Sequence, residues 1–207
     1  MLQVMGDATT LEDRIRAHCA EHRWVEATTL IVREYGPDIY GFLLTAHGGD
    51  DTATSEAFSD LTEALWRQLP AFRWESSART WAYAIAHKLT LMRRRDAARA
   101  RRRVVDAGVS ELERVAAHVR TETVSFLRTE KKDRLQAIRD SLPEDDRLLL
   151  LLRVDRGLSW NEIARILAGD SSLDDATLAK EAARHRKRYQ LLKDRLRQLA
   201  RREGLIR

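Results

Sequence analysis

The sequence predicts an all-α protein of two small helical domains joined by a linker, with a helix-turn-helix in the C-terminal domain. Apolar residues recur at helical spacing along nearly the whole chain of 207 residues. Only 3 prolines and 9 glycines are present, which argues against a turn-rich all-β fold. A hydrophobic content of 43% is enough for real cores, and a charged content of 33% suits long solvated helices.

The N-terminal domain is predicted to span residues 11–103. A break or kink is expected at Gly36-Pro37, because proline removes a helical N–H and crowds the preceding turn. Pro70 is expected to end a helix for the same reason. The expected elements are helices over 11–24 and 25–46, a turn over 47–50, a helix over 52–69, a loop over 71–78, and a helix over 79–95 whose apolar face is Trp81, Ile85, Leu89 and Met92.

A polar segment, residues 104–133, is predicted to be the linker between the domains, with some helix. It follows an arginine-rich run, residues 93–103, which holds seven arginines and one aspartate. Val105-Asp106-Ala107-Gly108 is the expected flexible point. The second domain is then predicted to span residues 134–203.

The C-terminal domain has the clearest local signals. Pro143 is predicted to occupy the first turn of a helix, and the three acids after it favour the positive end of the helix dipole. Five leucines, residues 148–152, make that helix apolar nearly all round, so it should be central. Gly157 is predicted to be a left-handed C-cap. Ser159 and Glu162 are spaced as a capping box that begins the next helix.

The last predicted helix has an apolar seam and a cationic outer face. Such a helix can pack inside and meet DNA outside, as the recognition helix of a helix-turn-helix does. The alternative is a basic surface helix that binds no DNA. The seam is Leu178, Ala182, His185, Tyr189, Leu192, Leu196 and Leu199, and the outer cations are Lys180, Arg184, Lys187 and Arg188.

The formal net charge of +5 is distributed unevenly. Residues 180–207 hold eleven Lys or Arg against three acids, a balance that attracts phosphates. Residues 50–65 hold five acids and no base, so this stretch is expected to face a basic protein surface. The alternative for each block is a merely solvated face.

Residues 72–95 mix aromatic rings with cations. Such a mixture suits single-stranded or melting DNA, because bases stack on the rings while the cations hold the backbone. A loop before a helix could also hold a flipped base. Trp81, which shares a face with Ile85, is expected to belong to the core, whereas Trp74 in the loop is expected to be exposed and functional.

No pattern in the sequence indicates a catalytic site, a metal or a cofactor. Cys19 is the only cysteine, which excludes an internal disulfide and a thiolate cluster, and its neighbours His18 and His22 make a weak metal pattern. No apolar run approaches the length of a membrane span, and the N-terminus lacks a signal-peptide pattern. The protein is therefore expected to be a cytoplasmic non-enzyme without membrane insertion.

Several segments, in this order along the chain, resemble the bacterial RNA polymerase sigma factors of the extracytoplasmic-function type, group IV of the sigma-70 family. Asp50-Asp51, Glu56-Ala57-Phe58 and Trp66 resemble the helix that clamps the polymerase, although Trp66 lies a helical turn beyond its family position. Residues 72–86 resemble the segment that melts and reads the minus-ten promoter element. Residues 142–144 and 157–164 resemble the domain that reads the minus-thirty-five element, although the loop 168–176 is longer than usual.

The resemblance implies a factor that gives core RNA polymerase its promoter specificity. Its implied partners are promoter DNA and core RNA polymerase, and an anti-sigma factor is left open as a third. The implied contacts are Asp51, Glu56, Asp60 and Glu63 for the polymerase; Arg73, Trp74, Ser76, Ser77, Arg79, Tyr83, His87 and Lys88 for the minus-ten element; and Ser159, Trp160, Lys180, Arg184, Lys187 and Arg188 for the minus-thirty-five element.

Three alternatives from other classes remain at this point. A helix-turn-helix regulator that does not bind core polymerase would need neither the acidic helix nor the aromatic loop. An RNA-binding protein is a second alternative, but readers of single-stranded RNA usually use sheets. An interaction module without DNA binding is the third.

Overall fold

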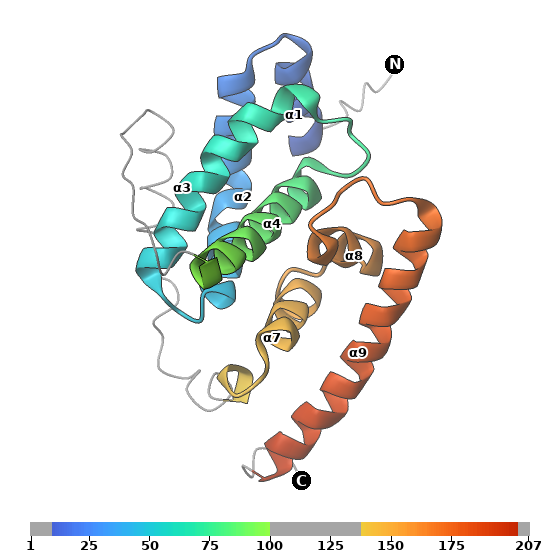
Figure 1. Ribbon diagram of the computed structural model, residues 1–207. Coiled ribbons are helices and arrows are strands. Elements are labelled where there is room, and N and C mark those ends of the chain that lie inside the picture. The colour runs from blue at the N-terminus through green and yellow to red at the C-terminus, as the bar shows by residue number, and fades with distance from the viewer. Residues whose placement is uncertain (1–9, 100–137, 203–207) are drawn as a thin grey trace, which may run out of the picture.

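The computed structural model describes residues 10–99 and 138–202, and within these ranges every regular element is a helix (Figure 1). The predicted all-α fold is confirmed. The predicted linker, 104–133, lies outside the described residues, so the division into domains stays a prediction.

Four α-helices and one short turn form the N-terminal part. The Thr10 hydroxyl accepts a hydrogen bond from the Asp13 N–H, and the Asp13 carboxylate accepts from the Thr10 N–H in return, which is a complete capping box. Asp50 caps a later helix by accepting from the Ala53 N–H at 3.0 Å. The elements are α1 (Leu11–Ala20), α2 (Trp24–Ala46), α3 (Asp51–Gln68), the 3₁₀ turn η1 (Leu69–Ala71) and α4 (Ala78–Arg99).

Helix α2 runs through Gly36 and Pro37 without interruption, so a break there was the wrong expectation. Pro37 removes only one N–H from the helical ladder. The turns around it are held by buried side chains on both sides, including Ile31, Val32 and Ile39. Packing of the apolar face therefore outweighs the local cost of the proline.

The C-terminal part consists of α7 (Glu144–Leu150), which continues as a π-helical turn η3 (Leu151–Asp155), followed by α8 (Trp160–Ala168) and α9 (Asp175–Arg202). Pro143 is the N-cap of α7, one position before the first turn where it was expected. Gly157 has a φ of 66°, which confirms its left-handed conformation. The Ser159–Glu162 capping box is also confirmed.

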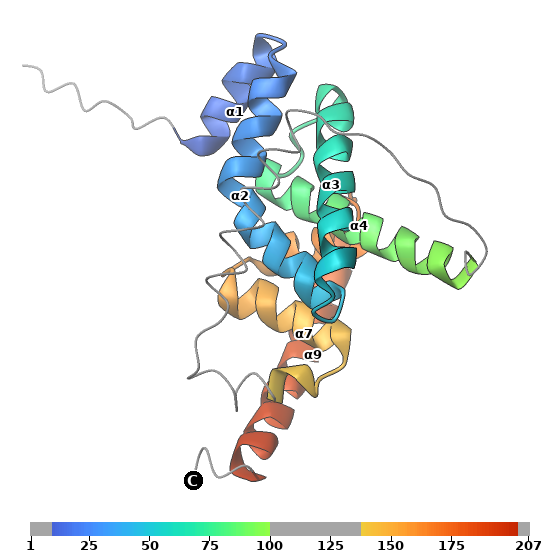
Figure 2. The same ribbon diagram turned by 90° about the vertical axis from the view of Figure 1, so that its left-hand side faces the viewer.

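One continuous apolar core joins the N-terminal and C-terminal parts. It contains Phe42 and Phe58 from the first part together with Leu148, Leu152 and Ile163 from the second. Helix α4 contacts α2 and α3 and also packs against α8. Figure 2 shows α2 and α3 side by side with α4 crossing them. Part of the face of α4 that does not meet α2 and α3 is thus covered by α8, while Lys88 and Met92 remain exposed.

Asp38 of α2 is one of the polar connections between the two parts, together with the Arg94–Glu144 ion pair and the Thr80–Glu162 hydrogen bond. Its carboxylate lies 2.8 Å from Nη1 of Arg156, which follows η3, and 3.4 Å from Nη2 of Arg79 at the start of α4. A Cβ at Gly41 would lie 3.1 Å from the Arg156 guanidinium, so the glycine allows Arg156 to lie close to α2. Both arginines are mostly covered, with side chains 28% (Arg79) and 24% (Arg156) exposed.

Asp38→Ala should lower the free energy of unfolding by about 1 kcal/mol. Charge-assisted hydrogen bonds are worth more when buried, but the Asp38 side chain is 38% exposed and solvent screens it. Urea unfolding measures the change. Asp194→Ala removes an acid from an ion pair within α9 and should have a much smaller effect. Equal destabilisation of the two variants would show that Asp38 does not hold the parts together.

Candidate nucleic-acid and polymerase interfaces

Three aromatic rings pack one against the next in the loop before α4 and at the start of that helix. Phe72 stacks on Trp81 with centroids 4.6 Å apart and an interplanar angle of 21°, and Trp74 packs at a tilt on Phe72, with centroids 4.7 Å apart. The guanidinium of Arg16, from α1, lies 4.6 Å from the centre of a Trp74 ring. Trp81 is 6% exposed, so its expected place in the core is confirmed.

Trp74 is half-buried, which corrects the expectation of a free, exposed ring. Its φ of 61° lies in the left-handed region, which a bulky residue adopts at a cost of about 1–3 kcal/mol. The contacts with Phe72 and Arg16 compensate for this strain. The packing of Phe72 and Trp74 cannot be predicted from helical spacing, because the loop that carries the two rings has no helical period.

The hydroxyl groups of the two loop serines, Ser76 and Ser77, form hydrogen bonds with backbone groups. The Ser77 hydroxyl accepts from the Thr80 N–H at 3.1 Å and caps α4, and the Ser76 hydroxyl donates to the Ser77 carbonyl at 3.3 Å. Glu12 of α1 accepts from the N–H groups of Ala78 and Arg79. No pattern in the sequence points to Glu12, because it lies 66 residues away from Ala78.

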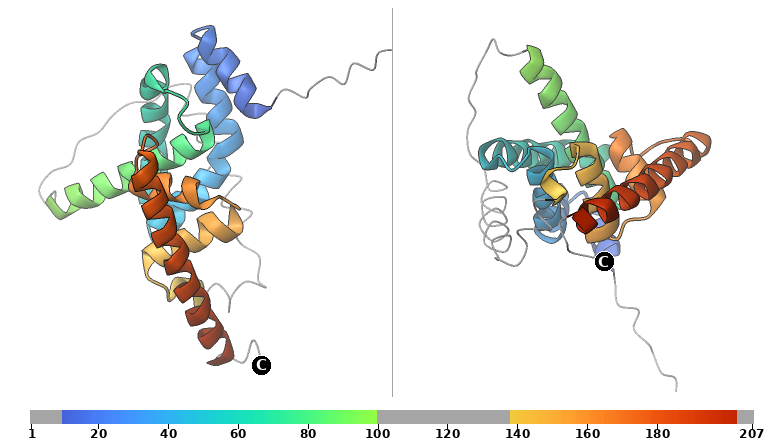
Figure 3. Two further views of the ribbon diagram at one scale, coloured as in Figure 1. Left: turned by 90° about the vertical axis from the view of Figure 1, so that its right-hand side faces the viewer. Right: turned by 90° about the horizontal axis from the view of Figure 1, so that it is seen from below.

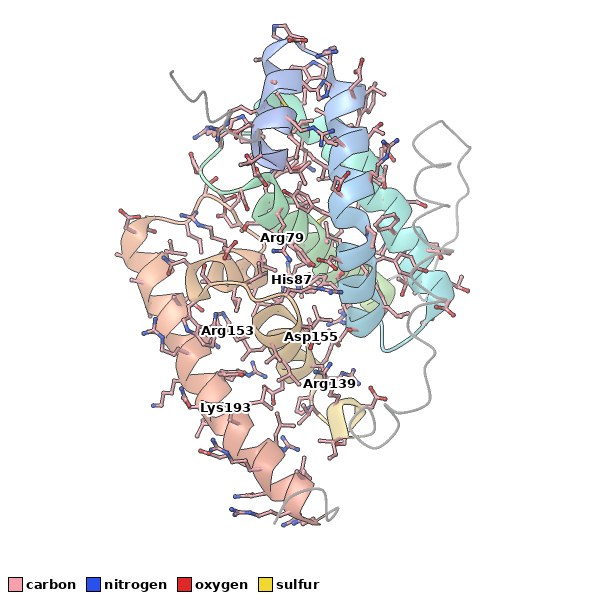
Figure 4. All side chains as sticks on the ribbon, turned by 180° about the vertical axis from the view of Figure 1, so that it is seen from behind. Arg79, His87, Arg139, Arg153, Asp155 and Lys193 are labelled. Atoms are coloured by element: carbon pink, nitrogen blue, oxygen red, sulfur yellow. The ribbon has the colours of Figure 1, made fainter. Side chains whose placement is uncertain are left out.

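Three of the predicted minus-ten residues lie where α4 meets the C-terminal part. Figure 4 shows Arg79 and His87 on the stretch of α4 that lies next to the C-terminal part. Tyr83 is fully buried; burial, and then the nearby Asp38 carboxylate, raise its pKa to about 12. Arg73 and Lys88, in contrast, are exposed. The structure thus separates the predicted set into free and covered residues.

The acids of α3 are partly neutralised by a cation from α4. Arg93 donates from Nε to Asp60 at 2.8 Å and from Nη1 to Glu56 at 3.0 Å. The acid-only stretch of the sequence is therefore not an acid-only surface. Asp51 and Glu63 remain exposed, and Glu63 pairs with Arg67, which is itself exposed, at 3.3 Å.

A hollow of about 370 Å³ opens between α3 and α4 next to these acids. The exposed Trp66 lies on the same helix, with 44% of its surface accessible. The hollow is lined by Asp60, Glu63, Ala64, Arg67, Gln68 and Leu89.

Helix α9 presents the cations predicted to bind DNA. Lys180, Arg184 and Lys187 are exposed, and the seam residues Leu178, Ala182 and Leu192 are buried, so the predicted two-faced helix is observed.

Arg188 is engaged within the protein rather than free. It donates to Asp146 at 2.6 Å and to Asp145 at 3.1 Å, which joins α9 to the first turn of α7. The Trp160 ring contacts Tyr189, with ring centroids 5.5 Å apart, and the guanidinium of Arg153 lies 4.8 Å from its centre. Ser159 is occupied as the N-cap of α8.

The described ranges contain no group of three or more His, Cys, Asp or Glu side chains that could hold a metal ion. Within the same ranges, no helix is both long and apolar enough to span a bilayer.

Two comparisons with known proteins agree with this geometry. Residues 31–100 match the family described as Sigma-70 region 2. The chain is also 30% identical to the RNA polymerase sigma factor YlaC of Bacillus subtilis (strain 168) over 166 residues, which cover 79% of this chain and 89% of that protein. The chain belongs to the sigma-70 family. This sigma factor is of the extracytoplasmic-function type and is an initiation factor rather than an enzyme, as the sequence predicted. No solved structure gives a significant match.

The stability of the sigma factor should fall as the pH drops below about 6.5, in part because of His87. Burial, and then the nearby Arg94, lower the pKa of His87 from its ordinary value of 6.5, while Asp145 and the Leu167 carbonyl act in the opposite direction. The unfolded chain therefore binds a proton that the folded one resists, and stability present above pH 6.5 is lost on acidification.

His87→Gln should flatten the decline in the free energy of unfolding between pH 7 and pH 5, measured by urea titration. The control is His22→Gln, in an exposed turn, which should leave the profile of the parent protein unaltered. A His87→Gln profile as steep as the parent's would contradict the assignment.

Proposed function

We propose that this sigma factor directs promoter recognition, promoter melting and transcription initiation through core RNA polymerase. One observation supports this best: α3, which carries the acids, and α9, which carries the outer cations, lie on opposite sides of the molecule with α4 between them (Figures 1 and 3). A protein partner and a DNA partner can therefore bind the same chain at the same time.

The polymerase-binding surface is proposed to be the exposed side of α3, with Asp51, Glu56, Asp60 and Glu63 facing a basic surface of the enzyme. Asp51 and Glu63 are the acids most free to do so. Glu56 and Asp60 share Arg93, which anchors them to α4 and keeps their carboxylates in place. The hollow beside them offers a depression that a protruding side chain of the partner can enter.

The minus-ten element is proposed to meet the loop and the exposed side of α4. Arg73 and Lys88 can contact phosphates directly, and Trp74 offers a ring on which an unpaired base can stack for about 1–3 kcal/mol. Ser76 and Ser77 shape the loop. Contacts from Arg79, Tyr83 and His87 would require the C-terminal part to move away from α4, since Arg156 accepts a hydrogen bond from Arg79 and α8 packs against α4.

The minus-thirty-five element is proposed to be read by a helix-turn-helix made of α8 and α9. The exposed cations of α9, Lys180, Arg184 and Lys187, would lie against DNA in the major groove. Arg188 supports them by fixing α9 to α7, and Ser159 and Trp160 lie at the start of α8, where they help to orient it.

The polymerase contact can be tested by reversing charge on α3 without disturbing Arg93. Asp51→Lys combined with Glu63→Lys should weaken binding to core RNA polymerase by about tenfold or more at low salt, and less at high salt, because rim charges are screened. A competition assay for core enzyme gives the affinity. Glu26→Lys with Glu34→Lys reverses two exposed charges on α2 and should change the affinity little. Equal affinity for all variants would place the polymerase elsewhere.

The upstream contact can be tested through the salt dependence of promoter binding. Replacing Lys180, Arg184 and Lys187 by alanine in the holoenzyme should lower the slope of log K against log salt by about 0.9 for each phosphate that the helix no longer neutralises. The control variant removes the same net charge from elsewhere in the protein. It combines Arg14→Ala in α1, Arg33→Ala in α2 and Arg23→Ala in the turn between these helices. A slope that falls as much in the control as in the α9 variant would argue against a recognition role for α9.

A further inference from the structure

Helix α1 precedes the region that matches the family described as Sigma-70 region 2, yet it makes polar contacts with the first residues of α4. The Glu12 carboxylate accepts three hydrogen bonds. Oε2 accepts from the Ala78 N–H at 2.8 Å, and Oε1 accepts from the Arg79 N–H at 3.3 Å and from the Tyr35 hydroxyl at 2.8 Å. A single side chain of α1 thus binds both the backbone of α4 and a tyrosine of α2.

These bonds complete the N-terminus of α4. The first N–H groups of a helix have no partner within it, and here Glu12 binds those of Ala78 and Arg79 while Ser77 binds that of Thr80. A carboxylate at this end also interacts favourably with the helix dipole. The start of α4, and with it the end of the loop, is therefore fixed by a residue of another helix.

Arg16 lies one helical turn after Glu12, on the same side of α1. Its guanidinium lies 4.6 Å from the centre of a Trp74 ring. Trp74 has a strained backbone, so its position depends on such contacts. Glu12 thus fixes the point where the loop joins α4, and Arg16 contacts the Trp74 ring in the middle of the loop.

Helix α1 is itself well anchored. The capping box of Thr10 and Asp13 defines its first turn, and Ile15 is completely buried in the core against α2. Tyr35 of α2 fixes the Glu12 carboxylate from a third direction. A helix held in this way can impose a position on the loop instead of following it.

We propose that α1 is a positioning element for the aromatic loop, with Glu12 and Arg16 as positioning residues that set Trp74 and the start of α4 for an unpaired base of melted promoter DNA. The proposal rests on the proposed function of the loop. Neither residue needs to touch DNA, because each acts through a group that does.

The first test measures the loop without DNA. In the full-length sigma factor, Glu12→Ala should accelerate amide hydrogen exchange at Ala78 and Arg79 by about tenfold or more, since it removes charged acceptors from both N–H groups. Glu12→Gln retains one carbonyl acceptor and should recover part of the protection. Arg14→Ala, on the same helix and exposed, is the matched control and should leave exchange unaltered. Unaltered exchange in Glu12→Ala would overturn the proposal.

The second test measures promoter opening by holoenzyme with permanganate footprinting. Glu12→Ala and Arg16→Ala should slow opening of a duplex promoter several-fold, Arg16→Lys should recover part of the rate, and the affinity for core polymerase should not change. Faster amide exchange with normal opening would make the contacts structural only and would overturn the proposal.

The variant Trp74→Ala distinguishes the proposed role of the loop in promoter melting from the proposed positioning role of α1. Slow opening in this variant supports a role for the loop in melting. Normal opening in Trp74→Ala, together with slow opening in Glu12→Ala, would refute base stacking on Trp74 as the route by which α1 acts. The amide exchange measurement tests the contact of Glu12 with α4 independently of the two promoter-opening measurements.

Discussion

The packing of α4 on two sides is the constraint on which the rest of the structure depends. Small buried residues, Ala78, Ala82 and Ala86, let neighbouring helices approach it closely. At the contact with the C-terminal part, a Cβ on Gly169 would lie 3.3 Å from the Cβ of Lys88, so the backbone after α8 nearly touches α4. The helix proposed to read the minus-ten element is thus the same helix that joins the two parts of the molecule.

The charges of the chain are organised by pairs that the linear sequence conceals. Arg93 lies in an arginine-rich run but pairs with Glu56 and Asp60 of α3, and Arg188 lies in a basic helix but pairs with acids of α7. Each of these cations determines how two helices pack. A count of charges along a segment therefore overestimates both the acidity of α3 and the number of free cations on α9.

The sequence predicted what depends on local patterns. The helices, the Ser159–Glu162 capping box, the left-handed Gly157 and the buried Trp81 all follow from spacings within a few turns. The contacts that shape the candidate site join residues that are far apart along the chain. Arg156 donates to the Asp38 carbonyl across 118 positions, and Glu12 binds α4 across 66. Nothing near Glu12 or Asp38 in the sequence distinguishes it from the other surface acids, because its role exists only once the helices have packed. The half-buried position of Trp74 was missed for the same reason.

The cover that α8 and the residues around it form over Arg79, Tyr83 and His87 also has a quantitative meaning. A protein whose binding-competent form is a small fraction of the population shows an apparent affinity reduced by that fraction. Every 1.4 kcal/mol or so by which the interface favours the covered form would then weaken the proposed minus-ten binding by the free sigma factor about tenfold. The pairing around Asp38 would contribute, together with the shared apolar core, to how far unassembled molecules are kept off the proposed minus-ten contact, and a partner that held the uncovered form would restore the full affinity.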